Sequence, residues 1–329
     1  MLSDKKNLAR FQEPILDDLK RFRASYKETL QSGLKVIDSV VAYLTRSHGK
    51  GLRPTLTLLC AKLGTNVLNE GSIRAAVIVE LLHEATLIHD DVVDESDKRR
   101  GLPSLPARFK NKVSVLFGDY MLANVLTETL DTRDLRFLDI LSQTAKRMSK
   151  GELVQAAKSK RLDLTEAEYL TMISDKTAAL FSACCRMGGL TGGLSEEHIE
   201  SAGKFGEKYG TAFQIKDDLL DLFGDGGLTG KPIGGDLKER KLTLPLLGAL
   251  SKVSPREARR IRARIRKGVR RRDIKQITEF VETSGGRQYA EDVMRREAGE
   301  AIKAVSNLPN SPIRETLIEL VSYSISRRR

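Results

Sequence analysis

The sequence predicts an all-α protein that forms a single domain of 329 residues. Apolar residues recur at helical spacing along most of the chain, and strict alternation of apolar and polar residues is almost absent. The Gly- and Pro-containing loop signals are short, and none has the length or composition of a flexible linker. We therefore expect residues 1–329 to fold as one helical domain.

The expected helices follow one another with brief interruptions. The stretch 72–95, GSIRAAVIVELLHEATLIHDDVVD, is apolar on most faces before its acidic end, which is typical of a buried central helix. The predicted helical stretches are 8–46, 72–95, 114–130, 133–159, 165–190, 196–223 and 236–251. Loop signals lie around 63–71, 187–193, 224–235 and 307–312.

The composition is that of an ordinary globular protein, with 40% hydrophobic and 30% charged residues. The net charge of +12 favours acidic partners without choosing among phosphates, membranes and nucleic acids. Three cysteines give no disulfide or metal framework. The first twenty residues lack the apolar region of a signal peptide, and no run reaches the roughly 18 apolar residues of a membrane span. The expected location is the cytoplasm, or at most the periphery of a membrane.

Two segments share an acidic pattern with spacing D-D-x-x-D. They are Asp90, Asp91 and Asp94, and Asp217, Asp218 and Asp221. On a helix, the first and fifth positions of each pattern lie one turn apart on the same face. Carboxylates crowded at the end of an apolar helix need compensating charge, and Mg²⁺ supplies it while sharing its ligands with substrate phosphates. Two facing acidic turns would thus hold a metal-bound diphosphate, whereas solvated helix surfaces are the alternative.

Basic and polar residues occur near these segments, where they could contact phosphate oxygens. Arg offers a planar fork for phosphate oxygens, and Lys offers a mobile point charge. The candidates are Lys50, Arg53, Arg99, Arg100, Lys176, Thr177, Gln214, Lys231 and Lys241. Each alone is compatible with a solvated surface, but together with two acidic clusters they fit a diphosphate clamp.

Several strings resemble the signature regions of the trans-polyprenyl diphosphate synthases. The longest are LLHEATLIHDDVVDESDKRRG, FQIKDDLLDLFGD and GKPIGGDLKERKLTLPL, with GKGLRP, GDYMLA, GELVQ and DKTAALF in the family's order. The resemblance spans about residues 40–250. It implies an isoprenoid-synthase-type helical bundle around a central cavity, usually a homodimer. It also implies head-to-tail condensation of an allylic diphosphate with isopentenyl diphosphate, and three Mg²⁺ ions per active site.

The resemblance also assigns roles to individual residues. Metal ions would be held by Asp90, Asp91, Asp94, Asp217 and Asp218, with Asp221 as a further candidate. The departing allylic diphosphate would be neutralised by Arg99, Lys176, Lys231 and Lys241. Isopentenyl diphosphate would be bound by Lys50, Arg53, His83 and Arg100. His83 lies seven residues before Asp90, nearly on the same helix face, although a core histidine is the alternative.

The residues before the first acidic cluster bear on product length. Thr86 and Ala85 lie one helical turn before Asp90, and a bulky aromatic there would close a tunnel about 6–8 Å below the metal site. These small residues, with the absence of a two-residue insertion in the first motif, favour a long-chain product such as a quinone side-chain precursor. Leu82, Met121 or Leu126 would form the tunnel floor.

Four alternatives remain at this point. They are a shorter-chain farnesyl or geranylgeranyl diphosphate synthase, a terpene cyclase, a catalytically silent partner subunit, and a basic nucleic-acid-binding protein. The Arg-rich segment 255–273 carries Ile261, Ile265 and Val269 at four-residue spacing, which indicates a solvated helix with an apolar inner stripe. Peripheral contact with an anionic membrane is left open for this segment. No aromatic platform accompanies it, so no nucleic acid is expected as a partner.

Overall fold

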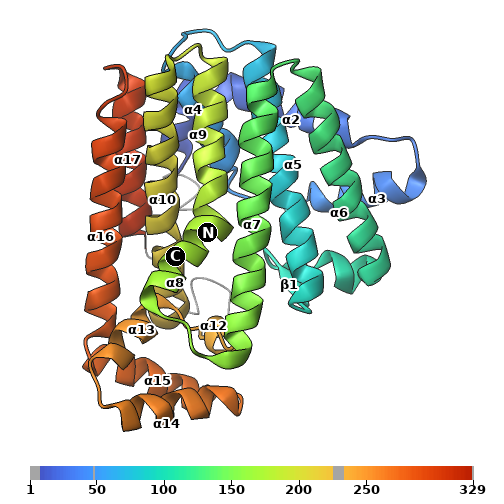
Figure 1. Cartoon of the computed structure of the whole chain (residues 1–329). Coiled ribbons are helices and arrows are strands. Elements are labelled where there is room, and N and C mark those ends of the chain that lie inside the picture. Colours follow the sequence, from blue (N-terminus) through green and yellow to red (C-terminus); the bar gives the residue numbers. More distant parts are fainter. Residues whose placement is uncertain (1–7, 47–48, 225–232, 328–329) are drawn as a thin grey trace. The chain divides into compact units, whose positions relative to one another are not determined.

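A computed structural model describes residues 8–46, 49–224 and 233–327, and over these residues the chain is almost entirely helical (Figure 1). The strands described are β1 (Lys98–Arg99) and β2 (Leu102–Pro103), which pair antiparallel. The all-α prediction is therefore confirmed. The chain divides into two compact units, and the expectation of one domain stays a prediction.

Unit one contains the residues up to Ser142, with Ala183–Gly203 and Asn307–Leu317. Its helices are η1 (Glu13–Ile15), α2 (Leu16–Leu30), α3 (Lys35–Leu44), α4 (Leu52–Lys62), α5 (Glu70–Val93) and α6 (Leu105–Asp131). Helix α5 packs against α2, α4 and α6, and it is buried on most of its faces. Asn69 caps it by accepting a hydrogen bond from the backbone N–H of Ser72 at 2.9 Å. The prediction of a buried helix here is confirmed.

Unit two contains Gln143–Ser182, Lys204–Ser306 and the residues from Ile318 onward. Its helices are α8 (Glu166–Ile173), the π-helical turn η2 (Ser174–Ala178), α12 (Gly235–Lys238), α13 (Leu244–Ser251), α14 (Pro255–Arg266), α15 (Arg271–Thr283) and α16 (Gly286–Val305). Helix α13 is buried from Leu244 to Leu250 and packs against α8, α15 and α16. A second apolar centre surrounds Tyr209, whose ring contacts Phe181, Phe205 and Phe213.

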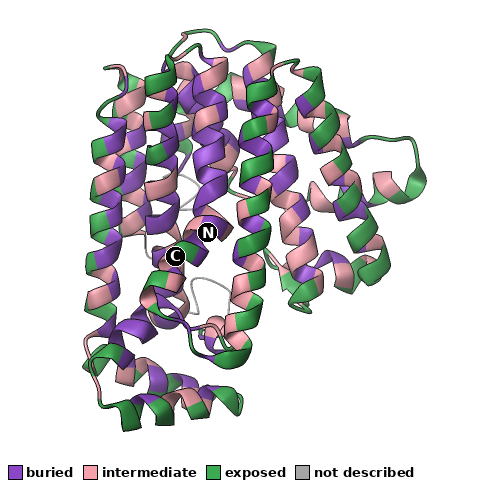
Figure 2. Cartoon of the chain, viewed as in Figure 1, coloured by how far each residue is buried: buried purple, intermediate pink, exposed green. Residues whose placement is uncertain are grey.

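The boundary between the units falls inside four long helices. They are α7 (Leu135–Arg161), α9 (Ala179–Thr191), α10 (Glu196–Phe223) and α17 (Pro312–Ser326). Figure 2 shows that long helices carry buried and exposed residues side by side, as an amphipathic pattern requires.

Three predicted helices are interrupted in the structure, and backbone chemistry explains the breaks. The stretch 8–46 divides around Gly33, whose φ of +74° cannot continue a helix. The stretch 165–190 divides at η2. The stretch 236–251 divides before α13, which has Pro245 in its first turn, where proline needs no hydrogen-bonded N–H. The helix expected at 196–223 has the bounds that were predicted.

Candidate active site

The first acidic cluster lies in unit one, at the C-terminal end of α5. Asp90 and Asp91 occupy its last turn, and Asp94 follows as the C-cap, with its N–H donating to the Asp90 carbonyl at 2.8 Å. Asp91 is buried, whereas Asp94 is exposed. The carboxylates of this motif therefore differ in their exposure to solvent.

The β1–β2 hairpin returns to α5 and brings two arginines to it. Its turn residues, Arg100 and Gly101, have φ angles of +52° and +82°, as a tight two-residue hairpin turn requires. Arg99 donates through Nε and Nη2 to Asp91 Oδ1, at 2.7 and 2.6 Å. Arg100 Nη2 donates to Glu84 Oε1 at 2.8 Å. The hairpin thus neutralises the buried Asp91 through Arg99. It also holds Arg100 at Glu84, which lies about two turns before Asp91 on α5.

A group of basic residues forms beside the middle of α5. Arg53, in the first turn of α4, donates through Nη1 to Nε2 of His83 at 2.9 Å. Gly49 lies so close to Arg100 that a Cβ there would be 2.8 Å from its Nη2. The structure therefore brings Arg53, His83 and Arg100 together, with Lys50 adjacent in sequence to this group and exposed.

Burial and neighbouring charges perturb several groups in this region. Burial, aided by Arg53 and Arg100, lowers the pKa of His83 well below its ordinary value. His83 is consequently a neutral acceptor for Arg53 rather than a third cation. Burial and the neighbouring Glu84 raise the pKa of Glu80 to about 7, although Arg53 and Arg100 oppose the shift. Sequence reasoning did not find Glu80 or Glu84, because glutamates on a helix carry no distinctive signal.

The second acidic cluster lies in unit two, near the end of α10. Asp218 is 4% exposed, and its carboxylate accepts two hydrogen bonds. Tyr169 donates through its hydroxyl to Oδ2 at 2.6 Å, and Gln214 donates through Nε2 to Oδ1 at 2.9 Å. Burial raises the pKa of Asp218 to about 7, with Asp217 and Asp221 contributing and the two hydrogen bonds opposing. The proximity of the three carboxylates thus adds to the effect of burial in favouring the protonated form of Asp218.

The other two aspartates of this motif face different partners. Asp221 accepts hydrogen bonds from the backbone N–H groups of Gly235 and Asp236, at 3.0 and 3.2 Å. These bonds tie α12 to α10. Asp217 is paired with Arg327, whose guanidinium also lies 4.2 Å from the centre of the Phe213 ring.

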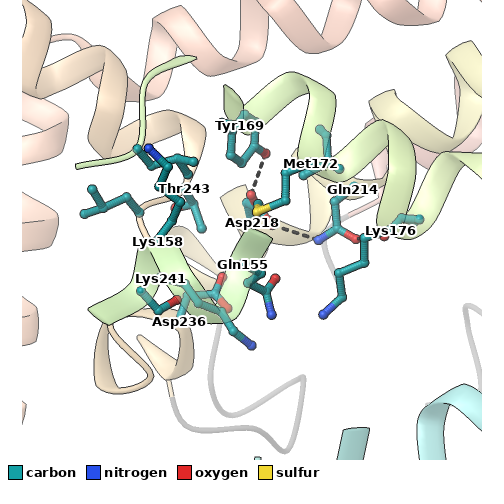
Figure 3. A pocket seen from close by; sticks show the side chains of 15 residues that line it. Gln155, Lys158, Tyr169, Met172, Lys176, Gln214, Asp218, Asp236, Lys241 and Thr243 are labelled. Carbon is teal, nitrogen blue, oxygen red and sulfur yellow. Dashed lines mark hydrogen bonds between the residues drawn. The ribbon is translucent and has the colours of Figure 1, made fainter. Parts of the chain in front are cut away.

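A pocket of about 110 Å³ opens onto Asp218 within unit two. Figure 3 shows Tyr169 and Gln214 directed at Asp218 in its wall. The lining residues predicted from sequence are Lys176, Thr177, Gln214, Asp218 and Lys241. Those that sequence reasoning did not single out include Gln155, Lys158, Tyr169, Asp236 and Thr243. The pocket therefore combines carboxylates, ammonium groups and neutral donors, which is a suitable lining for a charged polar ligand.

The π-helical turn η2 positions Lys176 and Thr177 at this pocket. A Cβ at Gly151 would lie 2.7 Å from the Lys176 backbone nitrogen, and one at Gly210 would lie 2.7 Å from the Ala178 Cα. Glycine at both positions therefore lets α7 and α10 approach the turn closely. Lys176 Nζ lies 2.6 Å from Glu152 Oε1, and Thr177 donates to Gln214 Oε1 at 2.9 Å. Single π-turns of this kind occur frequently at functional sites.

Comparisons with known proteins identify the family. The sequence model of the polyprenyl synthetase family matches residues 34–282. The chain belongs to the polyprenyl synthetase family. It is 35% identical over 323 residues to the octaprenyl diphosphate synthase of Escherichia coli, covering 98% of this chain and all of that one. It is therefore a prenyltransferase, as the sequence motifs predicted.

Solved structures of this family share the fold. A decaprenyl diphosphate synthase from Rhodobacter capsulatus superposes with a TM-score of 0.91 at 35% identity, covering 98% of this chain and 99% of the other. A polyprenyl synthase from Caulobacter crescentus, in complex with calcium and isoprenyl diphosphate, also gives a TM-score of 0.91, at 33% identity and 98% coverage of both chains. The predicted isoprenoid-synthase fold is confirmed.

The donor set of this polyprenyl synthetase fits a hard divalent cation. Its acidic residues offer carboxylate oxygens only, and burial, with the neighbouring Asp217 and Asp221, raises the pKa of Asp218, so a cation there would stabilise the ionised carboxylate. In the described part of the chain, no three His, Cys, Asp or Glu side chains converge as a complete metal site. Mg²⁺ typically binds one or two carboxylates plus substrate phosphates. A metal–diphosphate site therefore does not require the protein to supply all the ligands.

Other predicted residues have varied surroundings. Lys231 lies outside the described residues. Lys241 pairs with Glu239. Ala85 is fully buried, and Thr86 donates to the His83 carbonyl at 2.8 Å. Of the proposed floor residues, Leu82 and Met121 are buried.

Leu126 does not fit the predicted tunnel floor, because it is 55% exposed on α6. The apolar pattern of α6 covers an outward face as well as an inward one, so residue type alone could not separate the two.

Among residues 8–46, 49–224 and 233–327, no helix combines the length and apolar character needed to cross a bilayer.

Proposed function

We propose that this prenyltransferase extends an allylic diphosphate with isopentenyl diphosphate, in an all-trans head-to-tail reaction, to a long-chain polyprenyl diphosphate. The observation that carries the site assignment is the pocket at Asp218, which Lys176, Gln214 and Lys241 also line. Cations and carboxylates lining the same small pocket suit a diphosphate bound together with divalent metal.

The allylic diphosphate would be bound through Mg²⁺ at both acidic clusters, with three ions per site. The expected metal ligands are Asp90, Asp91 and Asp94 of the first cluster, and Asp217, Asp218 and Asp221 of the second. The metal supplies Lewis-acid stabilisation of the negative charge on the leaving diphosphate. Arg99, Lys176, Lys231 and Lys241 would add fixed positive charge to the same oxygens.

Isopentenyl diphosphate would be bound by the group at Arg53. Arg53 and Arg100 carry the charge, Lys50 adds a mobile ammonium, and His83 fixes the Arg53 guanidinium through their 2.9 Å hydrogen bond. Glu84 holds Arg100 in place until substrate arrives. Two separate cationic groups thus give each substrate its own site.

The reaction then follows from charge development. The allylic C–O bond breaks, which leaves an allylic cation and a diphosphate. The isopentenyl double bond attacks the cation to form the new C–C bond, and a proton leaves the adjacent carbon. We assign this proton to the released diphosphate. Exclusion of water protects the cation from quenching.

The side chains before Asp90 support the long-chain product. Ala85 and Thr86 are small, so a growing chain beside this face of α5 would pass them. We also propose a cytoplasmic homodimer. Exposed apolar residues on α6, namely Val115, Leu116, Leu126 and Leu130, support a protein partner for this helix.

The test is to incubate the purified protein with labelled isopentenyl diphosphate, farnesyl diphosphate and Mg²⁺, and to size the products. We expect a ladder that ends at a long chain after several additions. A single addition, giving geranylgeranyl diphosphate alone, would support the shorter-chain alternative. A cyclic hydrocarbon without incorporated label would identify a terpene cyclase.

A further inference from the structure

The positive charge of the chain is concentrated in one short segment. Residues 255–275 contain eleven Lys or Arg against two acids, Glu257 and Asp273. This segment therefore supplies nine of the twelve net positive charges. None of the residues assigned to the prenyl-transfer site lies in it. A charge excess of this size in a segment outside the active site calls for its own explanation.

Helices α14 and α15 display this charge outward. Ala258 and Ile265 bury the inner side of α14, and Ile274, Ile277 and Val281 bury that of α15. The basic residues that are exposed are Arg256, Arg259, Arg260, Arg266, Lys267, Arg270, Arg271, Arg272 and Lys275. Figure 2 shows both helices with large exposed areas. We call these nine residues the basic surface.

The two helices are fixed to each other, while much of the basic surface has no acidic neighbour. Arg264 on α14 donates to Gln276 Oε1 at 2.7 Å and approaches Asp273 Oδ1 at 3.4 Å, and both partners are on α15. Within the part of the chain that the structure describes, Arg256, Arg260 and Lys275 have no carboxylate at ion-pair distance. Their charges are therefore available to an external anion.

The chemistry of the basic surface favours a flat, multivalent anionic partner. No large apolar side chain is exposed on the described residues of α14 or α15, so insertion into hydrocarbon is not expected. Residues 255–279 contain no aromatic residue on which a nucleic-acid base could stack. Many Lys and Arg side chains without apolar or aromatic anchors suit contact with acidic lipid headgroups.

We propose that the basic surface docks the protein reversibly on the headgroups of an anionic lipid bilayer. The choice of a bilayer over nucleic acid rests on the proposed function, because a long polyprenyl product is insoluble in water and must pass into a membrane. Docking places the synthase where its product can leave. Since the contact is electrostatic, vesicle binding weakens as added salt shortens the Debye length.

The experiment is sedimentation of the full chain with vesicles, without substrates. Vesicles of phosphatidylcholine containing phosphatidylglycerol are compared with vesicles of phosphatidylcholine alone, at low and high salt. We expect binding only to the anionic vesicles and only at low to moderate salt. One variant combines Arg256→Gln, Arg260→Gln, Lys267→Gln, Arg271→Gln, Arg272→Gln and Lys275→Gln. Each lost charge weakens binding about fivefold, so the six substitutions together should weaken it roughly 10⁴-fold.

A control variant removes a smaller number of charges elsewhere in unit two. Lys146→Gln, Lys204→Gln and Lys303→Gln neutralise three exposed lysines on α7, α10 and α16, and this variant should retain most of the binding. The basic-surface variant should also keep its prenyl-transfer rate in detergent, which shows that it is folded. A protein that docks but makes only short products would contradict the proposed function and leave the basic surface intact.

Three results would overturn the proposal. The first is equal binding of the protein to both vesicle types, and the second is an equal loss of vesicle binding in the control variant. The third is displacement of the bound protein from anionic vesicles by single-stranded RNA at a lower concentration than by free headgroup phosphate. The last result would assign the basic surface to nucleic acid.

Discussion

The hydroxyl of Tyr169 makes the shorter of the two hydrogen bonds that Asp218 accepts from Tyr169 and Gln214, and its removal provides a focused perturbation. Tyr169 is 1% exposed on α8, and its hydroxyl donates to Asp218 Oδ2 at 2.6 Å. Tyr169→Phe keeps the buried ring and removes that donor alone. Gln214 would remain as a donor to the other carboxylate oxygen. The variant thus loosens the orientation of a carboxylate that we assign to metal binding, without creating a large cavity.

The size of the effect follows from the type of hydrogen bond. A hydrogen bond to a charged group contributes about 1.5–3 kcal/mol, and partners that orient metal ligands typically change metal affinity about 10–100-fold. We therefore expect the Mg²⁺ concentration for half-maximal activity to rise by roughly tenfold or more. At saturating Mg²⁺ most of kcat should return, because the carboxylate itself is still present.

The assay is the initial rate of isopentenyl diphosphate incorporation across a Mg²⁺ titration. The matched control is Tyr289→Phe, which removes a similar hydroxyl that donates to Glu166 at 2.7 Å in the same unit. The control should leave the Mg²⁺ dependence unchanged. An unaltered titration in Tyr169→Phe, or an equal shift in both variants, would refute the view that Tyr169 orients a metal ligand.

Three further predictions probe the substrate sites, the product path and a buried acid. Lys50→Ala and Arg53→Ala should raise KM for isopentenyl diphosphate about tenfold or more, whereas Lys176→Ala should lower kcat by about 10²–10³; steady-state kinetics with each substrate varied would show the reasoning wrong if the two effects were exchanged. Ala85→Phe should shorten the products toward farnesyl or geranylgeranyl diphosphate, at a stability cost of roughly 1–3 kcal/mol because the site is fully buried; an unchanged product ladder would argue against a chain path along this face. Glu80 has a folded-state pKa of about 7 against an ordinary 4.5, so the folded chain retains a proton that the unfolded chain releases, and the free energy of unfolding should fall as pH rises between these values. Glu80→Gln should flatten that fall, which amounts to at most about 3 kcal/mol by urea unfolding, and an identical pH profile in the variant would contradict it.

Local sequence patterns predicted the parts of the site that depend on nearby residues. The D-D-x-x-D spacing and the apolar residues before it were sufficient to place Asp90 at the end of a buried helix. The helix that carries Asp218 also had the predicted bounds. In both segments the helical period persists to the motif, so the carboxylates and their helices could be assigned together.

Contacts between distant segments could not be predicted in this way. Arg327 reaches Asp217 across 110 positions of sequence, and nothing in the terminal SISRRR distinguishes one arginine from the next. The β1–β2 hairpin has two-residue strands, too short for any alternation to show. The sequence patterns also did not identify Tyr169 as a site residue. It lies about two helical turns before Lys176, and that spacing could have suggested that the two share a helix face.

The account depends most on the claim that both acidic clusters hold the metal-bound allylic diphosphate, and one titration tests it directly. Incorporation of labelled isopentenyl diphosphate onto farnesyl diphosphate is measured against Mg²⁺ for the wild type, Asp90→Asn, Asp217→Asn and the double variant. We expect no incorporation in EDTA, a loss of about 10²–10³ in kcat for each single variant, and a double variant little worse than either, because groups that act as a unit are not additive. Full turnover in EDTA, or wild-type activity in either single variant, would contradict the account.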